Sequence, residues 1–354
     1  MKILEVMTEH TGPFKILVEV LKEMLQEANI EFLSDQPEKK LEKKKADDSE
    51  ELDSDEESDE ELDDEDDEEI DEDDEELEDD EEDEEDEENV QKQQKKKGGG
   101  MRITAIDMTK TVLINLKLDA NQFSTFKCKK QKITLGVNLG YLHKLIKSLD
   151  KEDNLTLYQD HDNKNLLKIK VDNQEGHKKT EFDLKLMELK KDKMNIPNVE
   201  FEAVVTMNST EFHKLCREMN QIADYVEIRC LKNKIEFICK GEIANRKTVY
   251  WTDTSENGNS KVHIEHPDVP NSKPFIVQGI YELKHLVMFG KCGTLCTDIE
   301  IYLKSDYPLV IKYQVATLGR LYLCLSPVKE DMIRNANFED DEDFYDEEEM
   351  KVIV

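Results

Sequence analysis

The sequence contains no run of apolar residues approaching the ~20 that a membrane-spanning helix needs. Near the N-terminus, Glu5 stands where a secretory signal would need its apolar core. We therefore expect a chain that is neither secreted nor membrane-spanning. The seven cysteines are an odd number scattered through apolar stretches, which favours a reduced intracellular protein over a disulfide framework.

Signatures of catalysis and of metal binding are also lacking. The sequence has no Gly-rich phosphate loop, no nucleophile elbow and no cluster of His, Asp and Glu at metal-ligand spacing. Cys292 and Cys296 are separated by three residues, but no second Cys/His pair lies nearby to complete a four-ligand zinc site. An enzyme would have to use Asp107 or the scattered histidines. We expect a protein that is not an enzyme and that needs no cofactor and no metal.

One long stretch of the chain lacks positive charge altogether. Residues 47–88, here called the acidic tract, hold 35 Asp or Glu residues and no Lys or Arg. The rest of the chain carries 49 acidic and 49 basic residues, so the tract accounts for the whole formal charge of −35. Such a like-charged block cannot bury enough apolar surface to offset its chain entropy. We predict disorder over 35–97, and a second acidic cluster predicts a tail over 330–354.

The remaining sequence repeats one unit, a helix followed by alternating strands. Apolar stripes at helical spacing have their first bulky residues near positions 14, 142, 212 and 283 (Phe14, Leu142, Phe212 and Leu283). The intervals are 65 residues (with the 63 residues of 35–97 left out), 70 and 71. Near-constant spacing of this kind indicates internal repetition.

The ends of these helices can be predicted from capping residues and from the apolar stripe. We predict that Thr11, Asn138 and Ser209 are the N-caps of the first three helices. The apolar stripe of the third helix reaches Ile222, and that of the fourth begins at Ile280. The acidic insert interrupts two strands, after IEFLSD and before MRITAID, so we expect its two ends to meet at a hairpin turn.

A connector divides the repeat into two similar halves. It lies within FDLKLMELKKDKMNIPNVEF (182–201), which begins as an alternating strand, loses its periodicity, and ends at Ile196-Pro197. Proline biases the residue before it towards extended backbone and prevents a helix from continuing. The sequence thus predicts an α+β fold of two similar domains. We expect the first domain to comprise 1–34 plus 98–183, the connector 184–200, and the second domain 201–329.

Each predicted helix carries two basic residues on the face opposite its apolar stripe. Residues seven apart differ by ~20° around a helix and residues three apart by ~60°, so both members of a pair share a face. One such pair is ordinary solvated surface, but four pairs in equivalent helices of a repeat predict a basic lining suited to phosphate contact without base reading. The eight residues are Lys15, Lys22, Lys144, Lys147, Lys214, Arg217, Lys284 and Lys291.

Four segments carry a resemblance to a known family: TEFHKLCREMNQIADYVEI, FDLKLMELKKDKMNIPNVEF, SDYPLVIKYQVATLGRLYLCLSP and KCKKQKITLGVNLGYLHKLIKSLDKEDNLTL. Through this long collinear similarity the chain resembles the eukaryotic-type DNA sliding clamps, the proliferating cell nuclear antigen family. The resemblance covers essentially everything except the acidic insert. It implies a homotrimeric ring of six similar domains around double-stranded DNA, bound non-specifically, with the eight basic residues facing the DNA.

The resemblance further implies that edge strands KKTEFDLKL and KTVYWTDT pair between subunits. It implies a front-face pocket beneath the connector, where DNA polymerase and other proteins insert a helical peptide, and a clamp loader as a further partner. The location implied is the nucleus, or a cytoplasmic replication site for a version from a large DNA virus. The matching pocket positions are Ile106, Lys110, Thr111, Leu113, Met194, Ile196, Pro197, Pro308, Ser326 and Pro327.

The sequence departs from the family pattern at two places in this pocket. Thr111 stands where the family usually has an aliphatic residue, and Leu323-Cys324 replaces a tyrosine pair before the Ser-Pro turn. Lys232, in RCLKNK, matches a position at which the family can be modified by ubiquitin-like proteins. It is also an ordinary exposed turn lysine.

Other classes of protein remain open at this point. In an acidic chaperone for basic proteins, the insert would be the active part and the fold a scaffold. A non-ring processivity factor, or one subunit of a heterotrimeric checkpoint clamp, is closer to the main interpretation. The oligomeric mass of the pure protein separates the latter two cases from a homotrimeric ring, and binding by the excised acidic peptide alone would indicate the chaperone.

Overall fold

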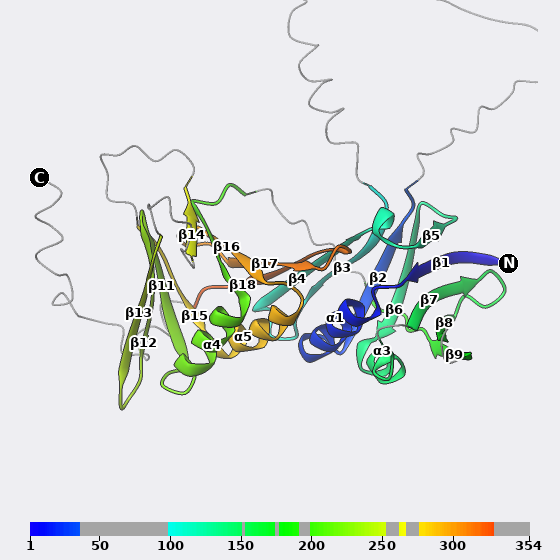
Figure 1. Ribbon diagram of the computed structural model, residues 1–354, viewed down its shortest axis with the longest axis horizontal. Coiled ribbons are helices and arrows are strands. Elements are labelled where there is room, and N and C mark those ends of the chain that lie inside the picture. Colours follow the sequence, from blue (N-terminus) through cyan, green and yellow to red (C-terminus); the bar gives the residue numbers. More distant parts are fainter. Residues whose placement is uncertain are drawn as a thin grey trace, which may run out of the picture. The chain divides into compact units, whose positions relative to one another are not determined.

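Figure 1 shows the computed structural model, which describes residues 1–35, 98–150, 153–173, 177–190, 199–252, 262–266 and 276–328. Except for Asp35, the insert predicted to be disordered lies outside the described residues, as does the predicted acidic tail. The first half of the chain forms β1 (Lys2–Thr8), α1 (Thr11–Met24), β2 (Glu27–Leu33), β3 (Gly100–Ile106), β4 (Val112–Asp119), η1 (Ala120–Gln122), β5 (Thr125–Cys128), β6 (Lys132–Asn138), α3 (Leu139–Ile146), β7 (Asp153–Asp160), β8 (Leu166–Asn173) and β9 (Lys178–Lys185).

The second half repeats this alternation of strands and helices. It forms β10 (Ala203–Asn208), α4 (Ser209–Met219), β11 (Tyr225–Leu231), β12 (Lys234–Lys240), β13 (Asn245–Trp251), β14 (Val262–Glu265), β15 (Ile276–Glu282), α5 (Leu283–Gly290), η2 (Lys291–Thr294), β16 (Asp298–Leu303), β17 (Leu309–Val315) and β18 (Gly319–Leu325). Among the described residues, no helix is long and apolar enough to cross a membrane.

The strands form three antiparallel sheets whose order reveals the duplication. The first half contributes the five-stranded sheet β5-β1-β7-β8-β9 and the four strands β4-β3-β2-β6. The second half contributes the five strands β14-β10-β16-β17-β18 and the four-stranded sheet β13-β12-β11-β15. The two halves correspond strand by strand in this order, so the predicted repeat is confirmed.

A seam between β4 and β18 joins the two halves. These strands pair antiparallel from Gly319↔Leu118 to Leu325↔Val112, which fuses five strands of one half and four of the other into a nine-stranded sheet. By the correspondence above, β9 is the equivalent of β18, and β13 is the equivalent of β4. Neither β9 nor β13 has a second partner strand within the described residues, so each is a sheet edge.

The helices pack against these sheets in two pairs. Helix α1 packs against α3 and helix α4 against α5, while α1 also contacts η2 of the other half. Figure 1 shows α4, α5, α1 and α3 on the same side of the nine-stranded sheet. Their buried residues, such as Phe14, Leu142, Phe212 and Leu286, join a single apolar core with the inward-facing strand residues. Burial of this stripe is what stabilises such short helices.

The structure corrects two of the three predicted N-caps. Asn138 caps α3 as expected, since its side chain accepts a hydrogen bond from the Tyr141 amide at 2.9 Å. Helix α1, however, begins at Thr11, after His10. The Thr11 hydroxyl does not cap the helix but donates to the Asp150 carbonyl at 3.0 Å.

Helix α4 is capped by Asn208, whose side-chain oxygen accepts from the amides of Thr210 and Glu211 at 3.1 Å. Ser209, predicted as the cap, is the first helical residue. Its hydroxyl donates to the carbonyl of Cys296 at 2.7 Å and so ties the helix to the segment before β16. Both amide and hydroxyl side chains can cap a helix, and here the Asn208 amide does so instead of the Ser209 hydroxyl.

Some residues of the predicted helical stripes lie outside their helices, and Ile280 and Ile222 are examples. Ile280 belongs to β15, where it pairs with Glu227, and α5 begins three residues later at Leu283. Ile222 follows α4, which ends at Met219, although its side chain still packs on the core. Both errors extend an apolar stripe across a helix boundary, where hydrophobic spacing alone cannot distinguish the last strand residue from the first helical one.

The two ends of the acidic insert lie together, as predicted. Strands β2 and β3 form a hairpin in which Leu33 pairs with Gly100. The Gly99 amide donates to the Asp35 carboxylate at 3.1 Å, and the Ser34 amide donates to the Gln131 carbonyl at 3.0 Å. Residues directly before and directly after the insert therefore both form hydrogen bonds that hold the end of this hairpin in place.

Candidate nucleic-acid interface and docking surface

The eight basic residues expected to face DNA all lie on α1, α3, α4 and α5 or at their C-caps. Lys15 and Lys22 belong to α1, Lys144 to α3, Lys214 and Arg217 to α4, and Lys284 to α5; Lys147 and Lys291 are the C-caps of α3 and α5. Because these four helices lie on the same side of the nine-stranded sheet, the structure brings the eight residues to that side (Figure 1).

These side chains differ in exposure and in the partners they have. Six are exposed, but Lys15 and Lys22 are half-buried. The Lys15 ammonium donates to the Leu149 carbonyl at 3.1 Å, so this lysine also links α1 to the segment after α3. Lys144 lies 5.2 Å from the centre of the Tyr141 ring on its own helix. Lys15 therefore has a structural role that its spacing did not reveal.

Carboxylates share this helical face, which sequence reasoning did not consider. Glu23, at the end of α1, lies 3.2 Å from the ammonium of Lys291 and 3.7 Å from that of Lys22. The hydrogen bond from Lys291 is the main reason that the pKa of Glu23 is lowered. This contact joins the two halves of the chain. Exposed Glu19 lies four residues after Lys15, close to the same face.

Two further ion pairs reduce the free positive charge. Lys214 lies 3.9 Å from Glu218 on α4, and Lys284 forms an ion pair with Glu282, the N-cap of α5. The helical face is therefore net basic but mixed in sign. Weak, salt-sensitive contact with phosphates suits such a face better than tight binding.

Two histidines lie at the junctions between paired helices. The pKa of His143 on α3 is lowered by burial and by the nearby cation of Lys22. The pKa of His213 on α4 is lowered by burial and by Arg217 and Lys291, and its ring packs against Gly290 of α5. Both imidazoles therefore favour the neutral form at pH 7. In the sequence each histidine directly precedes one of the eight basic residues. That position was the signal from which these histidines could have been predicted to lie near the basic face.

A second surface lies on the opposite face of the nine-stranded sheet. Ile106 pairs with Leu113, Leu113 with Cys324, and Cys324 with Val310 across β3, β4, β18 and β17. Directly paired residues point to the same face of a sheet. The alternate residues Val112, Leu325 and Leu309 are buried on the helical side, so Ile106, Leu113, Cys324 and Val310 face outwards as an outer apolar row.

The outer apolar row is partly accessible. Ile106 is 41% exposed, Leu113 and Cys324 are half-buried, and Val310 is 9% exposed. Neither Val310 nor Cys324 was among the predicted pocket residues, although Cys324 was recognised as a departure from the family pattern. Cys324 pairs with Leu113 across the seam, which no local pattern reveals, and Val310 joins the row through its pairing with Cys324.

Lys110 and Thr111 belong to a turn that Asp107 organises. The Asp107 carboxylate accepts from the amides of Val112, Thr111 and Thr109 at 2.7, 2.8 and 3.2 Å. Burial would raise the pKa of Asp107, but these bonds and the Thr109 hydroxyl outweigh it and lower the pKa. Lys110 takes a positive φ of 60° within this turn.

The other described pocket positions lie at the same end of the sheet. The Ser326 amide donates to the Thr111 carbonyl at 3.0 Å, and Pro327 follows it. Pro308 directly precedes β17, beside the end of β18. The structure thus brings Ile106, Lys110, Thr111, Leu113, Pro308, Ser326 and Pro327 to one end of β3, β4, β17 and β18. Met194, Ile196 and Pro197 lie outside the described residues.

The first part of the connector is fastened to the edge strand β6. The Met187 amide donates to the Gly136 carbonyl at 2.9 Å. A Cβ atom at Gly136 would lie 2.1 Å from the Met187 carbonyl oxygen, so this close approach requires glycine. The Asn29 side chain donates to the Lys190 carbonyl at 3.3 Å. The connector therefore leaves the first half along a fixed path.

Lys232 lies in the turn between β11 and β12 and is exposed, as expected from its sequence context. Its carbonyl oxygen lies 3.1 Å from Nε2 of His266. An exposed turn lysine of this kind is accessible to a modifying enzyme. Exposed lysines are also ordinary in turns that carry no modification.

Comparison with known proteins agrees with this architecture. Residues 88–195 match the model described as proliferating cell nuclear antigen, N-terminal domain, and residues 195–328 match its C-terminal domain. A protein of Acanthamoeba polyphaga mimivirus named "Probable DNA polymerase sliding clamp" is 36% identical over 236 residues, which are 66% of this chain and 48% of that protein. The chain thus spans about half the length of this relative.

Two further comparisons cover a larger share of the matched protein. "Probable DNA polymerase sliding clamp 1" of Paramecium bursaria Chlorella virus 1 is 28% identical over 233 residues, which are 65% of this chain and 84% of that protein. The crystal structure of proliferating cellular nuclear antigen from Entamoeba histolytica matches with a TM-score of 0.66 at 19% identity, covering 93% of this chain and 100% of that one. At this low identity, the match to the solved structure shows a shared fold.

Proposed function

The chain belongs to the proliferating cell nuclear antigen family, and from that premise we propose that it is a DNA sliding clamp. In this proposal three identical chains close into a ring around duplex DNA and hold a DNA polymerase, and other proteins of replication and repair, on the template. The chain acts by tethering and catalyses no reaction. Its site of action is where DNA is replicated, in the nucleus or at a cytoplasmic replication site.

The observation that carries the proposal is the equivalence between the internal seam and the two sheet edges. The seam pairs β18 with β4 inside one chain, and their equivalents β9 and β13 are the edges at the two outer ends of the repeat. Joining β9 of one chain to β13 of the next would repeat the seam's geometry between chains. A head-to-tail contact of this kind generates rings when its rotation closes.

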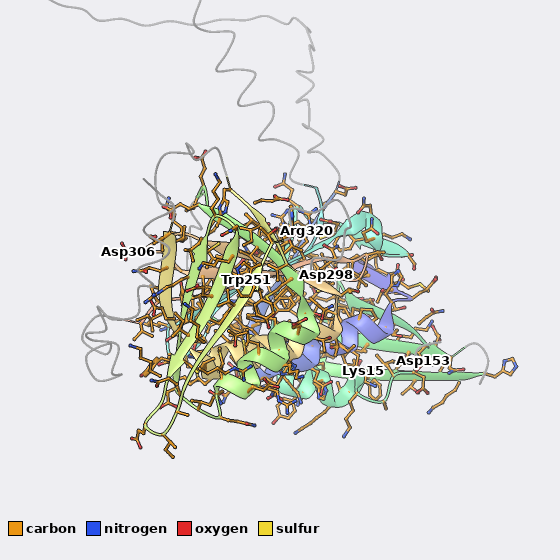
Figure 2. All side chains as sticks on the ribbon, turned by 60° about the vertical axis from the view of Figure 1, so that its left-hand side comes forward. Lys15, Asp153, Trp251, Asp298, Asp306 and Arg320 are labelled. Atoms are coloured by element: carbon orange, nitrogen blue, oxygen red, sulfur yellow. The ribbon has the colours of Figure 1, made fainter. Side chains whose placement is uncertain are left out.

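The composition of the edges supports this pairing. Strand β13 ends in Tyr250-Trp251, and the Trp251 side chain is 63% exposed (Figure 2). Proteins usually protect an edge strand by charge, by a bulge or by pairing, and an exposed tryptophan on an edge is suited to an interface. Strand β9 carries both charge signs along its outer edge, in KKTEFDLK.

The remaining roles follow from the proposed ring. The basic residues of the four helices contact phosphates of the enclosed duplex. The outer apolar row and the Asp107 turn receive a helical peptide of the polymerase, with Met194, Ile196 and Pro197 of the connector completing the pocket. A clamp loader opens the ring, and Lys232 is available for modification. We also retain the domain boundaries proposed from the sequence.

The mass of the purified chain in solution tests the proposal. Light scattering at micromolar concentration should give three times the 41.3 kDa of one chain. Replacing Trp251 by Asp places a charge at the contact between chains and should shift the mass towards that of a monomer. As a matched control, Met108→Asp changes another exposed apolar residue, 88% accessible, in the turn after β3 and should leave the trimer intact. A monomeric wild-type chain would contradict the ring.

A further inference from the structure

The first residues of α3 and α5 align the two halves of the chain residue by residue. Strand β6 leads directly into α3 and β15 directly into α5, while β7 and β16 are the next strands after these helices. Residues at equal distances from the two helix starts, Leu139 and Leu283, therefore correspond. Two corresponding pairs counted in this way are Leu135 with Gly279, and Leu157 with Ile301.

Strand pairing carries this correspondence to the edge strand β9. In the first half, a row of directly paired residues crosses β7, β8 and β9 at Leu157, Ile169 and Phe182. In the second half, the matching row crosses β16, β17 and β18 at Ile301, Ile311 and Leu323. Phe182 is therefore the equivalent of Leu323, and Thr180, two residues earlier, is the equivalent of Leu321.

The same procedure reaches the other edge strand, β13. In the first half, a paired row crosses β6, β2, β3 and β4 at Leu135, Ile30, Ile103 and Leu116. In the second half, the matching row crosses β15, β11, β12 and β13 at Gly279, Ile228, Phe237 and Thr248. Thr248 is therefore the equivalent of Leu116.

The seam then gives the register that a β9–β13 junction would have if it repeated the seam's geometry. The equivalents of Thr180 and Thr248 are paired directly in the seam. A junction of the same kind places Thr180 of one chain opposite Thr248 of the next. Because the two strands run antiparallel, Glu181 then lies opposite Lys247. Phe182 and its alternate neighbours face the core, so this pair points outwards.

The charges at this position are complementary, and each has a partner of opposite sign on its own chain. The Glu181 carboxylate lies 2.8 Å from the Lys179 ammonium, and Glu181 pairs with Lys170 across β8 and β9. The Lys247 ammonium lies 3.2 Å from the carboxylate of buried Glu236 on β12. Opposite charges directly across two strands stabilise their pairing. The junction would therefore continue the alternation of charge from one chain into the next.

Other registers of the junction differ in their charges. A displacement by one residue would turn the apolar side of β9 outwards. A displacement by two residues in one direction places Lys179 opposite Lys247, and these like charges repel. A displacement by two in the other direction places Asp183 opposite Lys247, and this register makes Asp183 the matched control for Glu181.

The seam and the junction differ at this position. The seam pairs two neutral residues there, Tyr322 and Asn115. Both strands of the seam belong to one chain, whereas a junction has to select its partner strand. Strand β13 carries Arg246 and Lys247 and no acidic residue, so pairing of two β13 strands would bring together cations only. A charged pair at the junction thus selects β9 as the partner of β13.

We propose that Glu181 of one chain and Lys247 of the next form an ion pair that fixes the register and the head-to-tail direction of the β9–β13 junction. The inference rests on the ring proposed above and names the residues by which one copy of the chain recognises the next. The pair favours the head-to-tail contact that a ring requires over contact between two identical edges.

Analytical ultracentrifugation of full-length variants tests the pair. Glu181→Lys should raise the dissociation constant of the oligomer about tenfold, because an attraction becomes a repulsion of similar size. Asp183→Lys makes the same change of charge on the same strand and face, and should have an effect several-fold smaller. The difference between the two variants should shrink at 0.5 M NaCl, since the pair is exposed. Equal effects, or a larger effect of Asp183→Lys, would overturn the proposal.

Restoring the pair in swapped order is the second measurement. Adding Lys247→Glu to Glu181→Lys should recover most of the lost association. Because Lys247→Glu places a carboxylate beside Glu236, a neutral cycle accompanies it: Glu181→Gln and Lys247→Gln, alone and together. The double neutral variant should lose little more than either single variant, as expected for two residues that act through one contact. Strictly additive losses would overturn the ion pair.

Cross-linking measures the register directly. Heavy and light isotope-labelled wild-type chains are mixed, reassociated and treated with a carbodiimide, which joins a carboxylate to a lysine amine that it touches. Glu181 of one label should be joined to Lys247 of the other. Joining of Asp183 to Lys247 instead would show the displaced register and overturn this inference while leaving the ring intact. A monomeric wild-type chain would overturn the ring itself, so the two failures are distinguishable.

Discussion

At the scale of single residues, Asp107 fixes the conformation of the turn between β3 and β4. Its carboxylate accepts three backbone amides and the Thr109 hydroxyl. Bonds of this kind to an ionised acceptor are stronger than those between neutral groups. The turn holds Lys110 at a positive φ, which an ordinary residue adopts at some cost, and so the carboxylate determines how the end of the pocket is presented.

Replacing Asp107 by Asn should lower the free energy of unfolding at pH 7 by about 1 kcal/mol, because the amide accepts these bonds less strongly. The pKa of Asp107 is lower in the folded chain than its ordinary value, so its ionisation stabilises the folded state above about pH 4. That stabilisation is lost as the pH falls through the folded pKa. Denaturant unfolding of both proteins from pH 7 to pH 3 should show the difference shrinking at the acid end; a constant difference would contradict this account.

Ile106 is the most exposed member of the outer apolar row and is the residue to change when testing the docking surface. Ile106→Asp should weaken binding of a helical peptide with aromatic and aliphatic anchors at least tenfold, because docking would desolvate the new charge. Thr104→Asp, two residues earlier on the same strand and face, is the matched control and should have little effect. Peptide titration by calorimetry measures both, and equal effects would place the docking site elsewhere.

At the scale of elements, the helices and strands differ in how well the sequence predicts them. Asn138 and the start of the apolar stripe of α3 are local signals, and both were interpreted correctly. The boundary between β15 and α5 was not, because Ile280 continues the apolar pattern of Leu283 and Leu286 without a break. Local periodicity predicts the existence of an element more reliably than it predicts the element's boundaries.

The candidate sites show the same limit. Basic spacing identified the eight helical cations, but it missed Glu23, whose partner Lys291 comes from the other half of the chain. Basic spacing also missed three cations that lie side by side across β3, β4 and β18. Arg102, Lys117 and Arg320 become neighbours through the β3–β4 hairpin and the seam, and the seam joins residues some 200 positions apart in the sequence. Pairing at that range leaves no periodic signal.

Helices α3 and α4 contribute four exposed cations, which allows a test of the helical face that leaves half-buried Lys15 untouched. Charge reversal of Lys144, Lys147, Lys214 and Arg217 to Glu should nearly abolish weak binding to duplex DNA at low salt. Each phosphate that the variant no longer neutralises should also reduce the salt slope by about 0.9. Fluorescence anisotropy across a salt series measures both quantities. Reversal of Lys127, Lys129, Lys130 and Lys164 is the control of equal charge, and the two variants behaving alike would contradict the assignment.

The start of the connector depends on Gly136 of β6. Gly136→Ala would bring a methyl group to 2.1 Å from the Met187 carbonyl oxygen, so the connector must move away from the strand. We expect hydrogen exchange at the Met187 amide to accelerate and peptide affinity to fall several-fold, with the oligomeric mass unchanged. Gly140→Ala meets nothing closer than 3.3 Å, the Asn138 side chain, and is the control. Unchanged exchange at Met187 would show that the connector is not held there.

At the scale of the whole molecule, the fold carries a 62-residue interruption, 36–97, at a hairpin whose two strands stay paired. Joining Asp35 directly to Gly98 should leave the melting temperature unchanged or a few degrees higher, because closing a long loop costs only about 1–3 kcal/mol more than closing a short one. Calorimetry of the two chains measures this, with light scattering to check that the mass is the same. A large fall in melting temperature or dissociation of the oligomer would show that the insert is structural.

The seam between β4 and β18 has a kinetic consequence in the proposed ring. If its strands part, the connector keeps them within reach of one another, and the millimolar effective concentration of such a tether makes them re-pair quickly. No covalent link holds a β9–β13 junction, so once parted its two chains can drift apart. Around the proposed ring, β4–β18 seams that re-form after parting would thus alternate with β9–β13 junctions that can separate. DNA could pass only through a junction between two chains.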